Sequence, residues 1–426
     1  MKKMECDVAV IGSGPGGLAA AIAASDHGAE KVLLIERDES LGGILQQCIH
    51  NGFGLHLLHE DLTGPEYAER FIAEVYKRPI ECLLQTMVIE LTSKRQITAI
   101  SRKEGILQIC PRAVVLAMGC RERTRGAISL PGSRPAGIMT AGTAQRFINI
   151  EGYLPGKEIV ILGSGDIGMI MARRLHLEGC HVKAVVELNN CIGGLSRNLV
   201  QCLHDFDIPL YLNHTITDIK GHKRVEEVAI TPLDKDGQLN RSKTFSMTCD
   251  TLLLSVGLIP ENELSKQADI LIDPHTGGPV VDQCYQTSIE GIFAAGNVVQ
   301  VFDLVDHVSI CGAKAGESAA RFALGKMTGW GNKIRHIAPG NGIRCVIPQK
   351  LSDPHGEEIH FYLRSNEVTR KATLQLLNND REPVFTEQFR IVRPPEMLHV
   401  AVGERNFTSS GQYTFCLTGE NEVVVK

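Results

Sequence analysis

The chain has 426 residues, which is enough for two to four domains. With 43% apolar and 22% charged residues, its composition is that of a globular protein and excludes a disordered or fibrous chain. The chain has 44 basic and 49 acidic side chains, giving a net charge of −5. It has no basic run and a single tryptophan, so we expect no nucleic-acid partner.

Targeting and metal signals are absent from the sequence. No apolar stretch approaches the ~18 residues of a membrane-spanning helix, and the amino-terminal stretch shows no signal-peptide cleavage site. The 13 cysteines are scattered, with neither a disulfide framework nor a zinc spacing, so we expect no metal. These features predict a cytoplasmic protein without a transmembrane segment.

Two stretches of the chain have the same pattern. Residues 6–36 and 157–187 each begin with a short apolar strand, continue through a glycine-rich turn into a helical segment, and end with a second strand. This order, in about thirty residues, is the signature of a βαβ unit. The sequence therefore predicts two nucleotide-binding folds.

Each turn carries a GxGxxG loop with an acidic residue at the same distance. The first loop is GSGPGG at residues 12–17, and Glu36 follows 19 residues after its last glycine. The second is GSGDIG at residues 163–168, with Glu187 at the same spacing. The glycines allow a tight turn, close approach of a pyrophosphate, and close helix packing, while the acid accepts ribose hydroxyls. Two such loops predict two bound dinucleotides.

The rest of the chain continues the α/β pattern and then changes. Apolar runs that end in glycine stand at residues 113–119, 251–257 and 291–297, and a helical stretch follows at 304–325. After about residue 333, period-2 segments such as EIHFYLRS and MLHVAVGE predict a small antiparallel sandwich.

This order of motifs resembles that of the two-dinucleotide flavoproteins of the pyridine-nucleotide–disulfide oxidoreductase superfamily, over residues 5–330. The resemblance implies an α/β fold with two Rossmann-like domains, the NAD domain being inserted in the FAD domain. Residues 1–145 and 252–332 are then the FAD-binding domain and 146–251 the NAD-binding domain. Residues 333–426 are expected to form a C-terminal all-β domain.

The resemblance also assigns residues to the two cofactors. The FAD set is Gly12, Ser13, Gly14, Pro15, Gly16, Gly17, Glu36, Arg37, Gly42, Gly43, Ile44, Ala117, Gly119, Gly296 and Asn297. The NAD set is Gly163, Gly165, Asp166, Ile167, Gly168 and Glu187. Asn297 departs from the family pattern, which has Asp there; an amide still hydrogen bonds to a ribityl hydroxyl but brings no charge.

The cysteine pair of the disulfide reductases is missing. These enzymes need two cysteines close enough to bond, spaced C-x4-C after the first loop or C-x2-C before the second. Neither spacing is present, and residues 137–145 read GIMTAGTAQ. Cys48 is the one thiol expected near the flavin. It is either a catalytic single cysteine or a small buried core residue.

Two clusters of charged residues remain to be interpreted. Asp303, Asp306 and His307 stand at the start of the helical stretch, as an acid–base pair or as compensation of the helix dipole. The resemblance implies that this helix points its amino-terminal end toward the flavin ring. The run Arg121-Glu122-Arg123 predicts a solvated surface.

A narrower likeness rests on GGILQQCIHNGFGLH, TAGTAQ, MARRLHLEG, GLSRNLVQCLHDFDIPLY and GNVVQVFDLVDHVS. Together these resemble the FAD/NAD oxidoreductases that accompany bacterial glycerol-3-phosphate dehydrogenases, and the flavin subunits of opine, amino-acid and cyanide-forming oxidases. The resemblance implies three partners: NAD(H), a small cysteine-rich electron carrier and a second dehydrogenase subunit. A homo-oligomer is left open.

Three functions follow as hypotheses. The favoured one is electron transfer between NAD(H) and a partner through FAD, within a glycerol-3-phosphate or amine/amino-acid dehydrogenase system. The second is a stand-alone NADH oxidase, peroxidase or single-cysteine disulfide reductase that uses Cys48. The third is a scaffold with structural dinucleotides, against which the intact glycines and acids of both loops argue.

Overall fold

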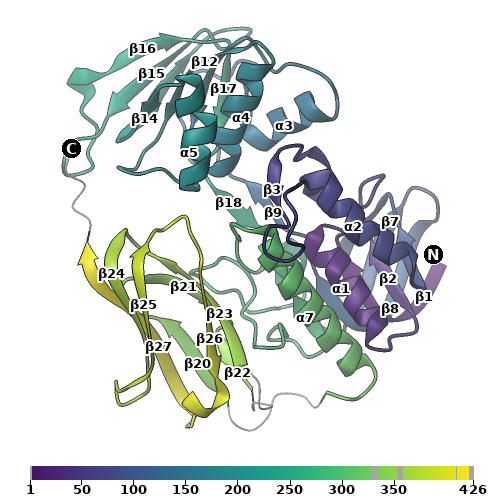
Figure 1. Cartoon of the computed structure of the whole chain (residues 1–426). Coiled ribbons are helices and arrows are strands. Elements are labelled where there is room, and N and C mark those ends of the chain that lie inside the picture. Colours follow the sequence, from purple (N-terminus) through teal and green to yellow (C-terminus); the bar gives the residue numbers. More distant parts are fainter. Residues whose placement is uncertain (1, 328–333, 353–357, 409, 422–426) are drawn as a thin grey trace. The chain divides into compact units, whose positions relative to one another are not determined.

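The computed structural model describes residues 2–327, 334–352, 358–408 and 410–421. The chain forms two compact units (Figure 1). Unit 1 contains residues up to Cys120 and from Pro260 onward, and unit 2 contains Arg121–Ile259. β9 (Cys120–Glu122) and β18 (Leu258–Pro260) carry the chain between them.

The main sheet of unit 1 is largely parallel. β1 pairs in parallel with β2 and β8, β2 with β5, and β8 with β19, while β8, β7 and β6 form an antiparallel meander. The strands are β1 (Lys2–Ile11), β2 (Val32–Ile35), β5 (Ile80–Leu83), β6 (Thr86–Leu91), β7 (Ile97–Ser101), β8 (Gly105–Leu116) and β19 (Ile292–Ala294). β3 (Asn51–Phe53) and β4 (Leu62–Thr63) form a separate antiparallel pair. All four residues of β2 are buried, as expected of a parallel strand covered on both faces.

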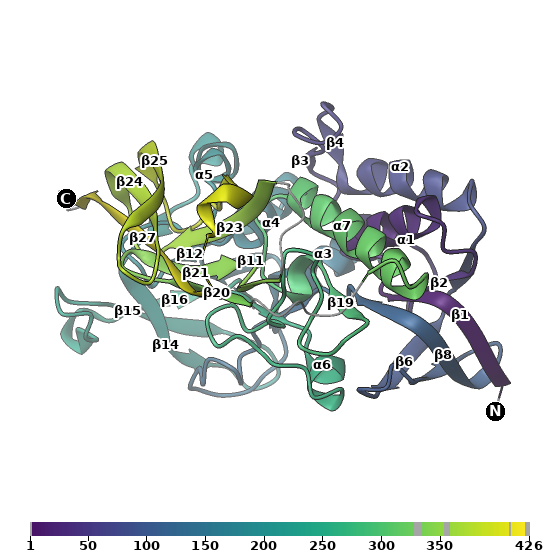
Figure 2. The same ribbon diagram turned by 90° about the horizontal axis from the view of Figure 1, so that it is seen from below.

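Two helices pack against this sheet and against each other. α1 (Pro15–Asp26) and α7 (Val305–Ala323) lie side by side in both views (Figures 1 and 2). Their backbones approach closely because Gly312 and Gly316 face α1. A Cβ at these positions would overlap the carbonyl oxygens of Gly16 and Ala20. Small residues at one helix face therefore set the distance between the two helices. α6 (Glu263–Gln267) is also in unit 1.

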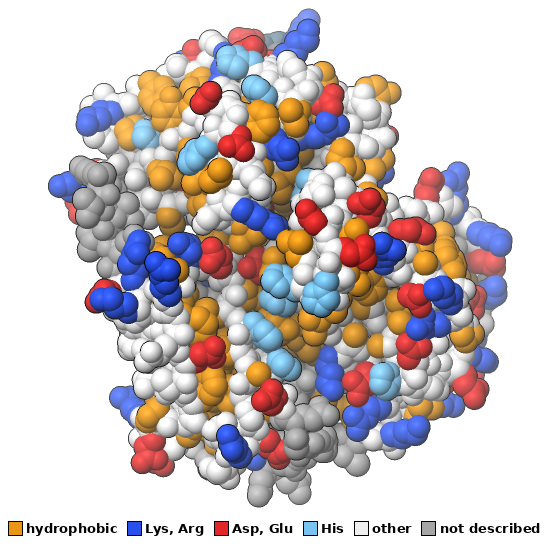
Figure 3. Space-filling model, viewed as in Figure 1, with side chains coloured by type: hydrophobic (Ala, Val, Ile, Leu, Met, Phe, Trp, Pro, Cys, Tyr) orange, Lys and Arg blue, Asp and Glu red, His pale blue; other side chains and the backbone are white. Residues whose placement is uncertain are grey.

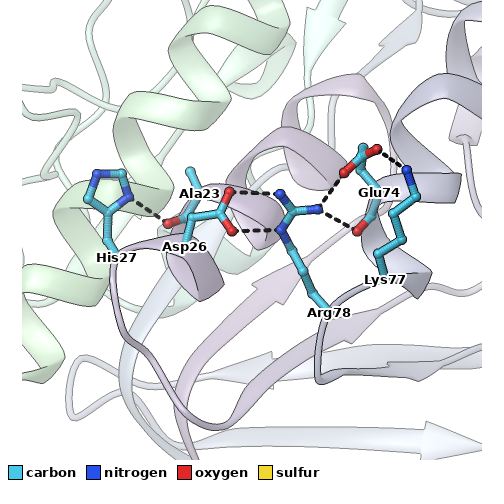
Figure 4. A network of polar contacts seen from close by, with 6 residues as sticks. All are labelled: Ala23, Asp26, His27, Glu74, Lys77 and Arg78. Atoms are coloured by element: carbon cyan, nitrogen blue, oxygen red, sulfur yellow. Dashed lines mark hydrogen bonds and ion pairs between the residues drawn. The ribbon is translucent and has the colours of Figure 1, made fainter.

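A charged fork joins α1 to α2 (Gly64–Tyr76), as Figure 4 shows. The Arg78 guanidinium donates from Nε and Nη2 to the two carboxylate oxygens of Asp26, at 2.7 and 2.9 Å. Its Nη1 donates to the carbonyl and carboxylate oxygens of Glu74, both at 2.7 Å. Lys77 also contacts Glu74, and His27 bonds to the carbonyl oxygen of Ala23. The two acidic groups hold the pKa of Arg78 above its usual range.

Unit 2 is built on a second parallel sheet, in the order β10-β17-β11-β12-β13. Its strands are β10 (Ile138–Thr140), β17 (Thr251–Leu254), β11 (Glu158–Leu162), β12 (His181–Val186) and β13 (Leu210–Tyr211). Alternate residues of β11 face two cores: Ile159 and Ile161 pack under the helices, and Val160 and Leu162 pack under a small antiparallel sheet. The helices are α3 (Ala141–Asn149), α4 (Asp166–Leu177) and α5 (Ser196–Cys202). The antiparallel sheet is β14 (His214–Lys220), β15 (Glu227–Pro232) and β16 (Phe245–Thr248).

The carboxyl-terminal strands form two sheets around one core, as predicted in outline. One sheet has β22 (Lys350–Leu351), β20 (Arg335–Pro339), β27 (Gly411–Asn421), β24 (Thr369–Leu377) and β25 (Pro383–Val392). The other has β21 (Ile343–Ile347), β23 (Glu358–Ser365) and β26 (Leu398–Gly403). The expectation of a purely antiparallel sandwich is wrong at one pair, because β20 and β27 run parallel. The chain between them crosses the whole second sheet, which gives a parallel pair the long connection it needs.

The sandwich is part of unit 1 and is bonded to it. Arg364 on β23 donates to the carbonyl oxygens of Pro394 and Pro395, at 3.2 and 2.6 Å, and to that of Val301 at 2.9 Å. The backbone N–H of Met397 donates to Asp303 at 2.9 Å. These bonds attach the sandwich to the segment that precedes α7.

The boundaries of the compact units differ from those placed on the sequence. The units divide at 120/121 and 259/260, whereas the sequence analysis divided the domains at 145/146 and 251/252. The reason is that β10 and β17 both pair in the second parallel sheet. The boundary placed at 332/333 lies outside the described residues. Which cofactor each range holds stays a prediction.

Candidate dinucleotide sites

Two of the three motif glycines in the first loop are required by the fold itself. Gly12 has φ +98°, and a Cβ there would lie 2.5 Å from the Ala117 carbonyl oxygen. A Cβ at Gly17 would overlap the Gly12 carbonyl oxygen. Gly14 differs, because a Cβ there would meet no heavy atom within 4 Å. This open space at the start of α1 fits the pyrophosphate of a dinucleotide, which the unpaired N–H groups of the helix attract.

Glu36 is held beside this loop at the end of β2. Its side chain is only 6% exposed. One carboxylate oxygen accepts from the N–H and hydroxyl of Ser13, at 2.9 and 2.6 Å, and the other accepts from the N–H of Asp38 at 2.9 Å. A carboxylate has about four acceptor positions, so one remains for a ribose hydroxyl. The neighbouring Arg37 is exposed.

The segment after β2 crosses the loop. Gly42, with φ +107°, donates its N–H to the Ser13 carbonyl oxygen at 3.0 Å. A Cβ at Gly43 would lie 3.0 Å from the Cα of Gly14. Gly42 and Gly43 therefore border the open space at Gly14 on one side, as the loop at residues 12–17 does on the other; we call them its second wall. Ile44 follows them and is 59% exposed.

The remaining residues of the FAD set come from the strand ends of the same sheet. Ala117 and Gly119 follow β8, and Gly296 follows β19, which pairs with β8. Gly296 has φ +73°, and a Cβ there would lie 2.9 Å from Val308 on α7. Because carboxyl ends of parallel strands share one edge, the sheet brings these residues to the loop, as the sequence predicts.

Pro15 and Gly16 belong to the helix rather than to the open space. Pro15 is the first residue of α1, where its missing N–H is not needed. A Cβ at Gly16 would lie 3.3 Å from Val308 of α7.

Asn297 presents a donor where an aspartate could not. Its side-chain oxygen accepts from the N–H of Phe302 at 3.0 Å. Its Nδ2 donates to the sulfur of Cys120 at 3.6 Å. The amide group is therefore oriented by the loop that leads into α7 and by Cys120.

The loop of unit 2 repeats this design. A Cβ at Gly163, with φ +98°, would overlap the Ser255 carbonyl oxygen, and one at Gly168 would lie 2.8 Å from that of Gly163. At Gly165 a Cβ would approach only Ser255, at 3.3 Å or more. The side chain of Ile167 packs against the core under the helices, so only its backbone is available to a ligand.

Glu187 is bonded to its loop serine as Glu36 is, but it accepts one bond more than Glu36, so about four of its acceptor positions are taken. It is 5% exposed, and one oxygen accepts from the N–H and hydroxyl of Ser164, at 2.9 and 2.6 Å. The other accepts from the N–H and the side-chain amide of Asn189, at 2.9 and 2.8 Å. Asn189, which sequence reasoning missed, therefore helps to orient the acid.

Asp166 points away from the loop in which it stands. Its carboxylate accepts from the N–H of Leu195 at 2.8 Å and from the side chain of Asn198 at 2.6 Å. In the same segment, the N–H of Gly193 donates to the hydroxyl of Ser164 at 2.9 Å. Sequence analysis gave residues 193–198 no role.

Cys48 stands at the end of a short 3-10 helix and is half-buried, with its Sγ donating to the carbonyl oxygen of Ile44 at 3.3 Å. Its carbonyl oxygen accepts from the N–H of Gly64 at 2.8 Å, and a Cβ at Gly64 would lie 2.8 Å from the Cβ of Cys48. All thirteen cysteines are free, and all of them are among the described residues. Whether Cys48 reacts stays a prediction.

The expectation of a solvated Arg121-Glu122-Arg123 surface is wrong for its central residue. Arg121 and Arg123 are exposed, but the carboxylate of Glu122 accepts from the N–H of Gly142 at 2.9 Å, at the start of α3. Burial raises the pKa of Glu122 although these bonds oppose the shift. This helix start is where a C-x2-C pair was sought in the sequence. A carboxylate satisfies its N–H groups there.

The aspartates around His307 bond to backbone N–H groups, although Oδ1 of Asp303 is buried without a partner among the described residues. Asp303 accepts from Met397, and Asp306 accepts from the N–H groups of His56 and Leu57, both at 3.4 Å. Among the described residues, Nδ1 of His307 is buried without a hydrogen-bond partner. Burial lowers the pKa of His307. The geometry favours the interpretation that these acids satisfy backbone groups over an Asp–His pair.

Rings of the sandwich cover His307. Its ring centre lies 5.0 Å from that of Tyr362 and 5.6 Å from that of His399. His399 stacks on His360, and their ring nitrogens are 3.0 Å apart. Histidine side chains gather at the middle of the view in Figure 3. No group of acids, histidines or cysteines in the described part of the chain is placed to hold a metal ion.

Two units, each with a parallel sheet and a glycine-rich turn at the start of a helix, define a class of α/β protein that binds two dinucleotides. Within that class, the chain belongs to the pyridine nucleotide-disulphide oxidoreductase family, whose sequence model matches residues 6–314. The family is one of oxidoreductases that use FAD and NAD(P).

Relatives of this chain include components of larger systems. The chain is 27% identical to the HcnB subunit of hydrogen cyanide synthase from Pseudomonas protegens, over 62% of this chain and 59% of that protein. It is 26% identical to an opine oxidase subunit of Agrobacterium tumefaciens, over 74% of this chain and 64% of that one. The match therefore spans less than two thirds of the length of either relative.

A solved structure supports the fold. Thioredoxin reductase of T. acidophilum superposes with a TM-score of 0.60 at 22% identity, covering 75% of this chain and 99% of that one. In the described residues, no helix is long and apolar enough to cross a membrane.

Proposed function

We propose that the protein uses FAD to carry electrons between NAD(H) and a partner protein or small acceptor, without a redox-active disulfide. The observation that carries the proposal is the pair of glycine-rich loops, each with a buried glutamate, in a chain whose thirteen cysteines are all free. FAD, when bound, would accept a hydride and pass on its two electrons. The system served is a glycerol-3-phosphate or amine/amino-acid dehydrogenase.

Each unit contributes one dinucleotide to this function. The loop at Gly14 and the carboxylate of Glu36 hold the ADP part of FAD in unit 1. The loop at Gly165 and the carboxylate of Glu187 hold NAD(H) in unit 2. Relatives that are named as subunits support a partner as the electron donor or acceptor. The cysteine-rich carrier and the second dehydrogenase subunit belong to this proposal.

NADH should reduce the flavin much faster than NADPH. The negative charge of Glu187 beside the loop repels a 2′-phosphate but not the uncharged hydroxyls of an NAD ribose. The basic groups on β12 are already paired, since His181 and Lys183 contact Glu158 at 3.3 and 2.8 Å. Stopped-flow bleaching of the flavin with each nucleotide measures the preference. Glu187→Ala should reduce it, whereas the exposed Glu226→Ala should not. A wild-type protein that prefers NADPH contradicts the proposal.

The alternative function through Cys48 makes a different prediction. If electrons leave without a thiol, Cys48→Ser should retain most NADH-dependent reduction of a quinone or tetrazolium dye. Thioredoxin-type and glutathione-type disulfides should be poor substrates for the wild type. Cys110→Ser, at an exposed cysteine, is the matched control. Steady-state assays with dye, peroxide and disulfide decide between the two. Turnover of peroxide or disulfide that is lost only in Cys48→Ser supports the alternative.

A further inference from the structure

The two units share more than the loop and the acid. Residues of the first unit recur 151 positions later without a gap: Gly12 and Gly163, Glu36 and Glu187, and the helix bounds 15–26 and 166–177. At the same offset, Gly42-Gly43 recurs as Gly193-Gly194. The Gly-Gly pair of unit 2 is therefore in the position that forms a wall beside the first loop.

The structure places this second pair against the second loop. The N–H of Gly193 bonds to the hydroxyl of Ser164, and a Cβ at Gly193 would lie 3.6 Å from the N atom of Gly165. It would lie 3.8 Å from the carboxylate of Glu187. The backbone of Gly193, which carries no side chain, thus lies beside both the second loop and Glu187.

The two units differ at the first residue of the helix that follows the loop. In unit 1, Pro15 stands where unit 2 has Asp166. A carboxylate in the first turn of α4 would repel a pyrophosphate there. Leu195 and Asn198 bind this carboxylate at 2.8 and 2.6 Å, and Asn198 is 8% exposed. The carboxylate of Asp166 therefore points toward residues 195–198, and its two hydrogen bonds hold that segment beside the start of α4.

We propose that residues 193–198 form the second wall of the nicotinamide-dinucleotide site, with Gly193 bordering the pyrophosphate. Asn198 is a positioning residue, which holds the wall closed through Asp166. The proposal deepens the proposed function and rests on it, because it specifies how the second site recognises its dinucleotide. Any dinucleotide with a ribose–pyrophosphate core, ADP-ribose included, should depend on this wall.

Gly193→Ala is the decisive variant, since the protein itself has room for the added methyl group. Its Cβ would meet only ordinary contacts, at 3.6 Å or more, but would stand beside the bound pyrophosphate. Calorimetric titration with NAD+ and with ADP-ribose should show a dissociation constant raised about tenfold, or about 1.4 kcal/mol. FAD content and melting temperature should stay at the wild-type values. Asn198→Ala should also weaken both ligands, because the segment loses its attachment.

Matched control variants test whether the loss of affinity is specific to residues 193–198. Gly126→Ala, whose Cβ would lie 3.8 Å from its nearest neighbour, and Asn190→Ala, at an exposed asparagine, should bind both ligands as the wild type does. Unchanged affinities in folded Gly193→Ala overturn the inference. If that variant melts early, unchanged affinities in Asn198→Ala overturn it instead. A wild-type protein that contains FAD but does not bind NAD+ contradicts the proposed function itself, and the inference with it.

Discussion

At the scale of single residues, glycines in one motif serve two different purposes. Gly17 allows α1 to pack on its loop, whereas Gly14 leaves space that the protein does not fill. Gly14→Val should therefore give a folded, colourless protein, because the side chain occupies the space of the pyrophosphate. Gly17→Val should fail to fold. Flavin absorbance together with far-ultraviolet circular dichroism distinguishes the two. Retention of FAD by Gly14→Val would show that the pyrophosphate lies elsewhere.

Residue spacing predicted where the carboxylates of Glu36 and Glu187 lie, but it did not predict the residues that hydrogen bond around the second loop. Glu36 and Glu187 follow from the motif, because a glutamate at the end of the second strand has to lie beside the first turn. Asn189 and Asn198 have no such signal, since their partners are set by a loop whose conformation local sequence does not determine. Glu122 was expected to be exposed, but the start of α3, twenty residues further along the chain, lies against it. The one signal available for Gly193-Gly194 was its constant offset from Gly42-Gly43.

At the scale of elements, contact between α1 and α7 depends on two glycines. A Cβ at Gly316 would overlap the carbonyl oxygen of Ala20, so Gly316→Ala must push the helices apart. Such overpacking costs about 1–3 kcal/mol. We expect a lower urea midpoint and, because α1 begins at the first loop, weaker retention of FAD. Gly126→Ala is the control for a glycine replaced where space exists. A midpoint equal to that of the wild type would mean that α7 shifts without loss.

Elements were predicted more reliably than their pairing. The apolar run at 113–119 covers the end of β8, and those at 251–257 and 291–297 contain β17 and β19, but β17 pairs in the second sheet and β19 in the first. A buried strand has the same composition in either sheet, so only tertiary contacts decide. The period-2 segments likewise predicted strands β23 and β26 without revealing that β20 and β27 are parallel.

At the scale of the whole molecule, the sandwich is bonded to the rest of the first unit. Its bonds to Val301 and Asp303 stand just before α7, and its rings cover His307. The sequence analysis predicted only that this domain is built of β-strands. The structure instead shows a domain that restrains the segment leading into a helix of the predicted FAD site. Its attachment should therefore influence both stability and flavin retention.

Acid should weaken this attachment through His399. Burial, together with the nearby His360 and His307, lowers the pKa of His399 to about 4, from an ordinary value near 6.5. A histidine with a lowered folded-state pKa binds its proton more readily in the unfolded chain, so stability falls as the pH drops from 6.5 to about 4. Because solvent reaches the ring, the loss is about 1 kcal/mol or less. His399→Gln lacks this proton, so its urea midpoint relative to wild type should rise steadily across that window. His222→Gln, at an exposed histidine, should show no such trend. A constant difference between His399→Gln and wild type from pH 6.5 to 4 would contradict the link between His399 and the docked sandwich.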